Sequence, residues 1–386
     1  MDNKIISLRS PHLILAGIGA SERLGQEAKG IGARKALVVT DKGVINSGIG
    51  KRIKDLLEKE GIGVEIFDEV ISDPDIKNVE TCIEMGKKGK YDLLVGVGGG
   101  SPMDIASITS VMVANPGSVR EYFGINLVKN PGIPTILIPT TAGTGAEVTQ
   151  NAVLTDTEEK MKKAIISPHL LARVAIIDPL LTLSMPPSVT SFTGMDALTH
   201  AVESYTSNNA TVLTDLFAKE AMILIGRSLR TAVAQGNQLE ARYDMSLGSL
   251  YAGISLANAG VAAVHALAYP LGGLFNIPHG IANGLLLPYV MEFNVLGNLP
   301  KFAQIAQFLG EKVDQMTLLD QAYCAAKAVK AIYRDLKIPQ SLTELNIPEN
   351  VIPTMAQAAI NVTRLLANNP RTMTLQDAEQ IYKKAL

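Results

Sequence analysis

Short apolar runs and amphipathic segments alternate along the first half of the chain. Five runs rich in β-branched or leucine residues have the length of buried strands: residues 36–40 (ALVVT), 64–67 (VEIF), 93–97 (LLVGV), 135–138 (TILI) and 174–177 (VAII). Between them lie segments with an apolar helix face, such as residues 50–60 (GKRIKDLLEKE) and 79–90 (VETCIEMGKKGK). Buried strands that alternate with helices predict an α/β fold with a doubly wound, mostly parallel sheet.

The pattern changes after residues 178–179 (DP). From about residue 186 onward, β-branched runs become scarce and apolar residues recur at helical spacing, over residues 211–230, 239–257, 301–310, 319–336 and 351–366. We therefore place a domain boundary near residue 180. Residues 1–180 are expected to form the α/β domain and residues 181–386 an all-helical domain, and a chain of 386 residues suits two domains.

Composition excludes several classes of partner. The chain is 47% hydrophobic and 19% charged with a net charge of −2, so no basic field exists to hold nucleic acid or an anionic membrane. Its two cysteines, Cys82 and Cys324, argue against a disulfide scaffold and suit a reducing cytoplasm. Residues 13–20 (LILAGIGA) contain two glycines, which favours a buried strand and turn over a signal peptide. No unbroken apolar run reaches about 18 residues, so no membrane span is predicted.

A glycine-rich stretch indicates a dinucleotide site. In residues 93–107 (LLVGVGGGSPMDIAS) a buried strand runs into glycines, and Ser101 as N-cap, Pro102 at the first position and Asp104 at the third would begin a helix. Glycines before a helix N-terminus allow a pyrophosphate to approach the backbone N–H groups. The alternative is an ordinary strand–helix turn, and the G-x-G-x-x-G fingerprint is not met because Ser101 replaces its last glycine.

Two further features agree with this interpretation. Asp41 directly follows the strand at residues 36–40, where a carboxylate can bind a ribose diol and would repel a 2′-phosphate, which favours NAD over NADP. Residues 138–149 (IPTTAGTGAEVT) place Thr140, Thr141 and Thr144 behind another strand, where hydroxyls could line a pyrophosphate or the nicotinamide ribose. The alternative for Asp41 is an ordinary turn aspartate, and the alternative for residues 138–149 is an ordinary turn.

A charge-free stretch in the second half holds two histidines. Residues 245–291 contain no Asp, Glu, Lys or Arg, yet include His265 and His279. Asp196 and His200 are four residues apart in a helical pattern, so they share one face. Buried polar groups are costly unless they are paired, and one divalent cation would pair these four side chains. Three imidazoles and a carboxylate suit Fe²⁺ or Zn²⁺, and prolines and glycines between His265 and His279 are expected to break a helix so that both rings face one point. The alternative is a set of structural histidines.

Four motifs, in order along the chain, resemble those of the iron-containing (group III) alcohol dehydrogenases. They are GGGSPMD at residues 98–104, PTTAGTGAE at 139–147, GMDALTHAVESY at 194–205 and HALAYPLGGLFNIPHGIAN at 265–283. The resemblance spans essentially the whole chain. It implies a nucleotide-binding α/β domain, a helical metal domain, and an active site in the cleft between them.

Carried over residue by residue, the family's metal ligands fall on Asp196, His200, His265 and His279, with Fe²⁺ as the expected metal and Zn²⁺ as the alternative. Its NAD contacts fall on Asp41, Gly99, Gly100, Ser101, Asp104, Thr140, Thr141, Thr144 and Lys162, with Asn151 and Leu181 near the nicotinamide. The resemblance also implies a homodimer or a larger homo-oligomer.

Three positions depart from the family pattern. Tyr269 stands where members often carry a second histidine that relays a proton or contacts the substrate, and a phenol with a pKa of about 10 is a poor base at neutral pH. Ser107 stands where many members have lysine. Asp73 replaces a common asparagine near the cofactor, where a carboxylate close to phosphates would be unfavourable.

The expected function is reversible oxidation of small primary alcohols or diols to aldehydes, with NAD⁺ as hydride acceptor and the metal as a Lewis acid. Tyr269 is expected to line the route of the departing proton, and Ile254, Leu256 and Leu274 to flank an apolar pocket. One alternative is a lyase similar to dehydroquinate synthase, although the charge-free stretch lacks the Lys and Arg cluster that a phosphate-bearing substrate needs. The other is a dinucleotide-binding protein without turnover.

Overall fold

The computed structural model describes residues 5–159 and 161–386. The chain forms two compact units that meet in sequence at Met185 and Pro186: Ser10–Met185 is one, and Pro186–Leu386 with the segment ending at Arg9 is the other.

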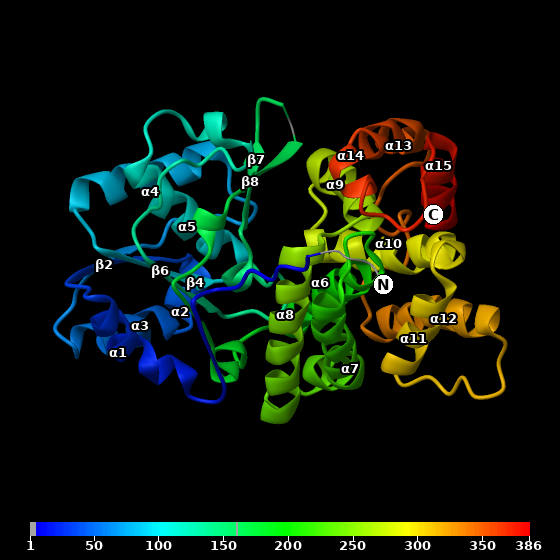
Figure 1. Cartoon of the computed structure of the whole chain (residues 1–386), viewed down its shortest axis with the longest axis horizontal. Helices are drawn as coiled ribbons and strands as arrows, with labels where there is room; N and C mark the ends of the chain where they lie inside the picture. The colour runs from blue at the N-terminus through cyan, green and yellow to red at the C-terminus, as the bar shows by residue number, and fades with distance from the viewer. Residues whose placement is uncertain (1–4, 160) are drawn as a thin grey trace. The chain divides into compact units, whose positions relative to one another are not determined.

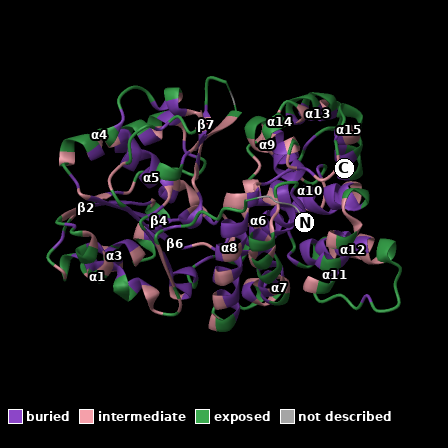
Figure 2. Ribbon diagram, in the orientation of Figure 1, coloured by how far each residue is buried: buried purple, intermediate pink, exposed green. Residues whose placement is uncertain are grey.

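The first unit is built on a parallel sheet of six strands (Figure 1). Its order is β1-β9-β6-β4-β2-β3, with bounds β1 Leu13–Ala16, β2 Lys35–Val39, β3 Gly63–Phe67, β4 Leu93–Gly98, β6 Thr135–Pro139 and β9 Val174–Ile177. The central strands β4 and β6 are buried at every residue, as Figure 2 shows, because helices cover both faces of the sheet. The predicted doubly wound, mostly parallel sheet is confirmed.

Alternate strand residues pack into two separate cores. Leu37 and Val39 of β2 lie in one core with residues of α4 and α5, whereas Ala36 and Val38 lie in the other with residues of α1 and α3. This follows from the pleat, which points successive side chains to opposite faces. The helices of this unit are α1 Leu24–Ile31, α2 Lys42–Asn46, α3 Ile49–Glu58, α4 Ile76–Gly89 and α5 Gly100–Ala114.

A second sheet of three strands was not predicted. It comprises β5 Gly124–Ile125, β7 Asn151–Asp156 and β8 Met161–Ile166, with β7 and β8 antiparallel. The β8 run contains two lysines, so the apolar pattern that marks buried strands is weak there.

The second unit is helical over its described residues, as predicted. Its helices are α6 Pro187–Thr206, α7 Val212–Ala234, α8 Leu239–Ala259, α9 Ala263–Phe275, α10 His279–Asn294, α11 Leu299–Phe308, α12 Leu318–Asp335, α13 Ile352–Ile360, α14 Thr363–Leu366 and α15 Leu375–Lys384. Helix α6 is buried at every residue from Gly194 to Thr206, so its polar side chains lie inside the unit.

Within the described ranges, no single helix is long and apolar enough to cross a membrane, and α8 with α9 meets the length and composition criteria only as a pair bent by 103°.

Candidate metal centre and cofactor-binding residues

Helix α6 carries the first pair of predicted metal ligands. Asp196 and His200 lie one helical turn apart, and both are buried. The helix packs closely on α7 at Gly194, where a Cβ atom would lie 2.3 Å from Cδ1 of Leu229. This contact places the ligand-bearing turn of α6 in the interior of the helical unit.

Helices α9 and α10 carry the other two predicted ligands, His265 and His279. The helix ends between them, as expected, but later than Pro270 and the two glycines: α9 continues through Pro270 and ends before Asn276, whose φ is 55°. The chain reverses over residues 276–278, and α10 begins at His279. A proline inside a helix removes one backbone hydrogen bond, and Pro270 is nevertheless accommodated there as a buried residue.

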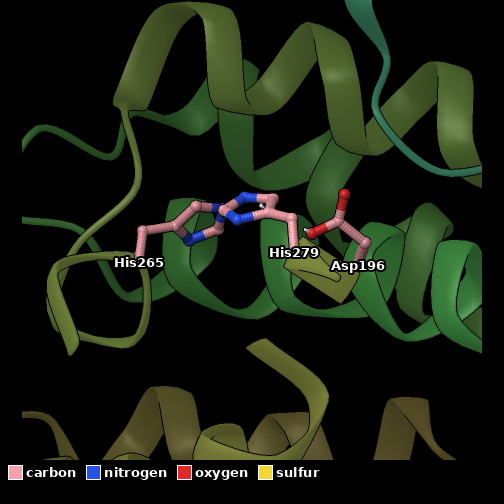
Figure 3. Close-up of side chains that lie close together, drawn as sticks. All are labelled: Asp196, His265 and His279. Atoms are coloured by element: carbon pink, nitrogen blue, oxygen red, sulfur yellow. Dashed lines mark ion pairs between the residues drawn. The ribbon is translucent and has the colours of Figure 1, made fainter. Parts of the chain in front are cut away.

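Three of the four predicted ligands converge. One donor atom from each of Asp196, His265 and His279 lies within 4.8 Å of the other two. Figure 3 shows the two imidazole rings side by side and the carboxylate of Asp196 directed toward His279, with Nε2 of His279 3.9 Å from Oδ1 of Asp196. The histidine ring centroids are 5.1 Å apart. These spacings suit donors that share one cation.

His200 lies beside this group. Its Nε2 is 3.8 Å from Oδ1 of Asp196, and its ring stacks on that of His265 with centroids 5.0 Å apart. It is not among the three residues whose donors all lie within 4.8 Å of one another, so its role as the fourth ligand stays a prediction.

The side chain of Asn283 reveals an excess of acceptors at this point. Its amide nitrogen lies 2.8 Å from Oδ1 of Asp196 and 3.1 Å from Nε2 of both His265 and His279. An amide NH₂ has two hydrogens and cannot satisfy three lone pairs together. Burial disfavours the charged form of Asp196, but the neighbouring imidazoles outweigh it and hold the pKa of this carboxyl below its usual value. The donor set therefore fits a divalent cation.

Glu203 is a site residue that the sequence analysis missed. It lies on α6 seven residues after Asp196 and is 4% exposed. Its carboxylate lies 2.6 Å from Nδ1 of His265. The signal was present in the sequence, because positions 196, 200 and 203 share one helical face.

Tyr269, the departure from the family pattern, lies near the histidines. Its ring centroid is 6.3 Å from that of His279, and it packs in an apolar cluster with Leu256. Burial raises the pKa of Tyr269, and the nearby cationic Arg364 of α14, which the sequence did not place here, opposes that rise. Of the other two expected pocket residues, Ile254 is buried and Leu274 is exposed.

The glycine-rich and threonine-rich segments face each other in the first unit. A Cβ atom on Gly100 would lie 3.1 Å from Cγ2 of Thr144, and one on Gly99 would lie 3.7 Å from Oγ1 of Thr141. Helix α5 begins at Gly100 with Gly99 as its N-cap, so the predicted N-cap at Ser101 was wrong. The N–H groups of the first helical turn have no acceptor within the helix, which is why Pro102 fits as the third helical residue.

Asp41 lies at the same edge of the sheet as these glycines. Its Oδ1 accepts a hydrogen bond from the backbone N–H of Val44 and caps α2, which agrees with the alternative that Asp41 is a turn aspartate. Its Oδ2 would lie 3.3 Å from a Cβ atom on Gly98, whose φ of +149° disfavours other residues. The second oxygen thus lies beside the glycine-rich turn, and its contact with a ribose stays a prediction.

The remaining predicted cofactor contacts have different surroundings. Oδ2 of Asp104 accepts a hydrogen bond from the N–H of Val153, and burial raises the pKa of Asp104 to about 7. Lys162 forms an ion pair with Asp73. Asn151 is the first residue of β7, and Ser101 is partly buried. Three other residues are buried: Thr140, Leu181 and Ser107, the last being one of the departures from the family pattern.

Comparisons with known proteins cover nearly the whole chain. Residues 11–179 match the family model described as iron-containing alcohol dehydrogenase, and residues 190–386 match that of the Fe-containing alcohol dehydrogenase family, C-terminal. The chain is 41% identical to long-chain-alcohol dehydrogenase 1 of Geobacillus thermodenitrificans, over 97% of this chain and 95% of that protein.

Solved structures agree with this match. The crystal structure of a 1,3-propanediol oxidoreductase is 40% identical, with a TM-score of 0.97 over 99% of this chain and 100% of that one. A sulfoacetaldehyde reductase from Bifidobacterium kashiwanohense in complex with NAD⁺ is 30% identical, with a TM-score of 0.88 over 99% of each chain.

Proposed function

Because the chain belongs to the iron-containing alcohol dehydrogenase family, we propose that it interconverts small primary alcohols or diols and aldehydes, with NAD as the hydride carrier. Names of relatives support this chemistry: one is a long-chain-alcohol dehydrogenase, another a 1,3-propanediol oxidoreductase, and a third was solved with NAD⁺. The observation that carries the proposal is the convergence of Asp196, His265 and His279 on one point.

The residues divide into two sets. Asp196, His265, His279 and His200 would hold a divalent metal, most simply Fe²⁺ as the family name indicates. The loops around Gly99–Gly100 and Thr141–Thr144, with Asp41, would hold the dinucleotide. When bound, the metal supplies Lewis acidity toward an alcohol or carbonyl oxygen, and NAD supplies the hydride acceptor or donor.

Tyr269 contributes a hydrogen-bonding hydroxyl and not a base. Its raised pKa keeps the phenol protonated at neutral pH. Its place near His279 supports a role in lining the path by which the proton leaves. Leu256, in the same cluster, supplies an apolar wall for the alkyl part of a substrate.

The test separates the metal from the cofactor. The enzyme is reconstituted with Fe²⁺ or Zn²⁺ and assayed on a panel of alcohols, diols and aldehydes, with butanal and NADH as the first pair. His265→Ala is expected to lose both bound metal and turnover, whereas unchanged values for both would refute the assignment. NADH binding without turnover on any substrate would favour a non-catalytic dinucleotide-binding protein.

We also propose a cytoplasmic homo-oligomer. The resemblance supports a homodimer or larger assembly, and the two cysteines, both free, suit a reducing compartment. Light scattering of the purified protein tests the first point, and a monomeric mass at assay concentrations would contradict it. Fractionation of cells tests the second.

A further inference from the structure

We propose that Glu203 is a positioning residue for the metal centre: it holds the proton of His265 on Nδ1, so that Nε2 presents its lone pair to the cation. The inference rests on the proposed metal site. It concerns a residue that does not touch the metal itself, and it predicts how strongly the site binds an ion.

Glu203 is surrounded by donors. Its Oε2 lies 2.6 Å from Nδ1 of His265 and accepts a hydrogen bond of 3.0 Å from the N–H of Ala262. Its Oε1 accepts a hydrogen bond of 2.6 Å from the N–H of Val264. Both oxygens of the carboxylate thus already accept backbone hydrogen bonds, and a carboxylate oxygen has no hydrogen to donate. The third partner, Nδ1 of His265, must therefore carry the hydrogen.

This proton assignment determines what the other side of the ring can do. With its hydrogen on Nδ1, a neutral imidazole has a lone pair on Nε2. Nε2 of His265 is the atom that faces the amide nitrogen of Asn283, beside Asp196 and His279. The lone pair is thus directed to the point where the other donors meet. A carboxylate on the far nitrogen also makes the imidazole a stronger ligand.

Glu203 also aligns two helices. The backbone N–H groups that it accepts belong to Ala262 and Val264, the N-cap and an early residue of α9, and α9 has no side-chain cap of its own from the N-cap residue. The carboxylate is therefore the cap of α9, supplied by α6. The same face of α6 carries Asp196 and His200. One helix therefore positions two predicted metal ligands of its own and, through Glu203, the ring of His265.

Charge gives a second reason for a carboxylate here. Residues 245–291 contain no charged side chain, so a buried divalent cation needs its balance from elsewhere. Asp196 and Glu203, both about 4% exposed, supply two negative charges within one cluster. A neutral side chain at position 203 would leave the loaded site with a net positive charge.

The experiment measures Zn²⁺ affinity of the full-length apoprotein by competition with a chromophoric chelator. Glu203→Gln keeps the size but removes the charge and turns an NH₂ group toward N–H donors, so we expect Zn²⁺ to bind about 10- to 100-fold more weakly. Glu203→Asp keeps the charge on a shorter side chain, so its Zn²⁺ affinity is expected to lie between those of the wild type and Glu203→Gln.

The matched control is Asp244→Asn. Asp244 is another buried carboxylate of the helical unit, and the hydrogen bonds described for it come from Arg227 and Ser228, neither of which is a predicted ligand. Loss of the Asp244 carboxylate should lower thermal stability and leave the Zn²⁺ dissociation constant of the folded protein unchanged. A purely structural role for Glu203 would make the two variants behave alike.

A measurement on the unaltered apoprotein covers the case in which Glu203→Gln does not fold. Long-range ¹H–¹⁵N correlation spectra of histidine-labelled protein, assigned with His265→Ala, should show the Nδ1–H form of His265. An Nε2–H form, or wild-type Zn²⁺ affinity in folded Glu203→Gln, would overturn the inference alone. If His265→Ala also binds Zn²⁺ like the wild type, the proposed metal site falls with it.

Discussion

The side chains of Lys162 and Asp73 form an ion pair, with Nζ of the lysine 2.5 Å from Oδ1 of the aspartate. Asp73 adopts a left-handed conformation with φ of 51°, and its backbone oxygen accepts a hydrogen bond from Oγ1 of Thr155 at the adjacent strand β7. Lys162 is the cation predicted to contact the cofactor. The carboxylate at position 73 thus pairs with the ammonium group that the sequence analysis predicts to contact the dinucleotide.

Replacing Asp73 by asparagine should strengthen NADH binding. The change frees the ammonium group of Lys162 and removes a negative charge, but Asp73 is half-exposed, so solvent screening limits the gain to about 0.5–1 kcal/mol, or roughly two- to fivefold in Kd. Fluorescence titration with NADH measures it. Lys162→Met should weaken binding, and weaker binding by Asp73→Asn would show that the pair itself organises the site.

Metal binding should stabilise the fold. A cation that binds only the native state, at about 100 times its Kd, adds about 2.7 kcal/mol to the free energy of unfolding. Thermal unfolding followed by circular dichroism, with Zn²⁺ or with a chelator, measures the shift. His279→Ala is the suitable comparison because this side chain is the least buried of the three converging ligands. Its apoprotein should unfold near the wild-type temperature and gain little from Zn²⁺.

Glu147 should make stability depend on pH. It lies in the threonine-rich segment, is 2% exposed, and its Oε2 has no hydrogen-bond partner among the described residues. Burial raises the pKa of Glu147 to about 7, so the folded state binds its proton more tightly than the unfolded chain, where the pKa is about 4.3. The stability that this proton contributes is fully present below the pKa of Glu147 in the unfolded chain and is lost as the pH rises to about 7.

Glu147→Gln should remove that dependence. Between about pH 4.5 and 7, the wild type should lose stability relative to the variant by up to about 1.4 kcal/mol per pH unit. Urea unfolding followed by circular dichroism suits a chain without tryptophan. Parallel pH curves for the two proteins would show that Glu147 ionises normally in the fold.

Tyr269→Phe should change kcat by less than about threefold, because a phenol whose pKa is raised is not a base at neutral pH. Tyr269→His should instead introduce a group that titrates near pH ~6.5 into the pH–rate profile. Steady-state assays over pH 5–9 measure both. A loss of about a hundredfold or more in Tyr269→Phe would assign the hydroxyl a direct part in proton transfer.

Patterns within a segment predicted much of this molecule. The alternation of Leu37 and Val39 with Ala36 and Val38 requires both faces of β2 to be covered, and the structure places helices on both. The spacing of Asp196 and His200 predicted one helical face, because 3.6 residues per turn bring positions four apart together. Local periodicity encodes the direction of each side chain within its own element.

Contacts between distant segments were outside the reach of such patterns. Glu203 meets His265 across 62 residues, and Leu366 of α14 packs in the same cluster as Tyr269, although neither pairing has a spacing rule. The strand order and the continuation of α9 through Pro270 likewise depend on what packs against each element. Periodicity in the chain specifies which face of an element is apolar or polar, and the packing of the whole fold selects the partner that this face meets.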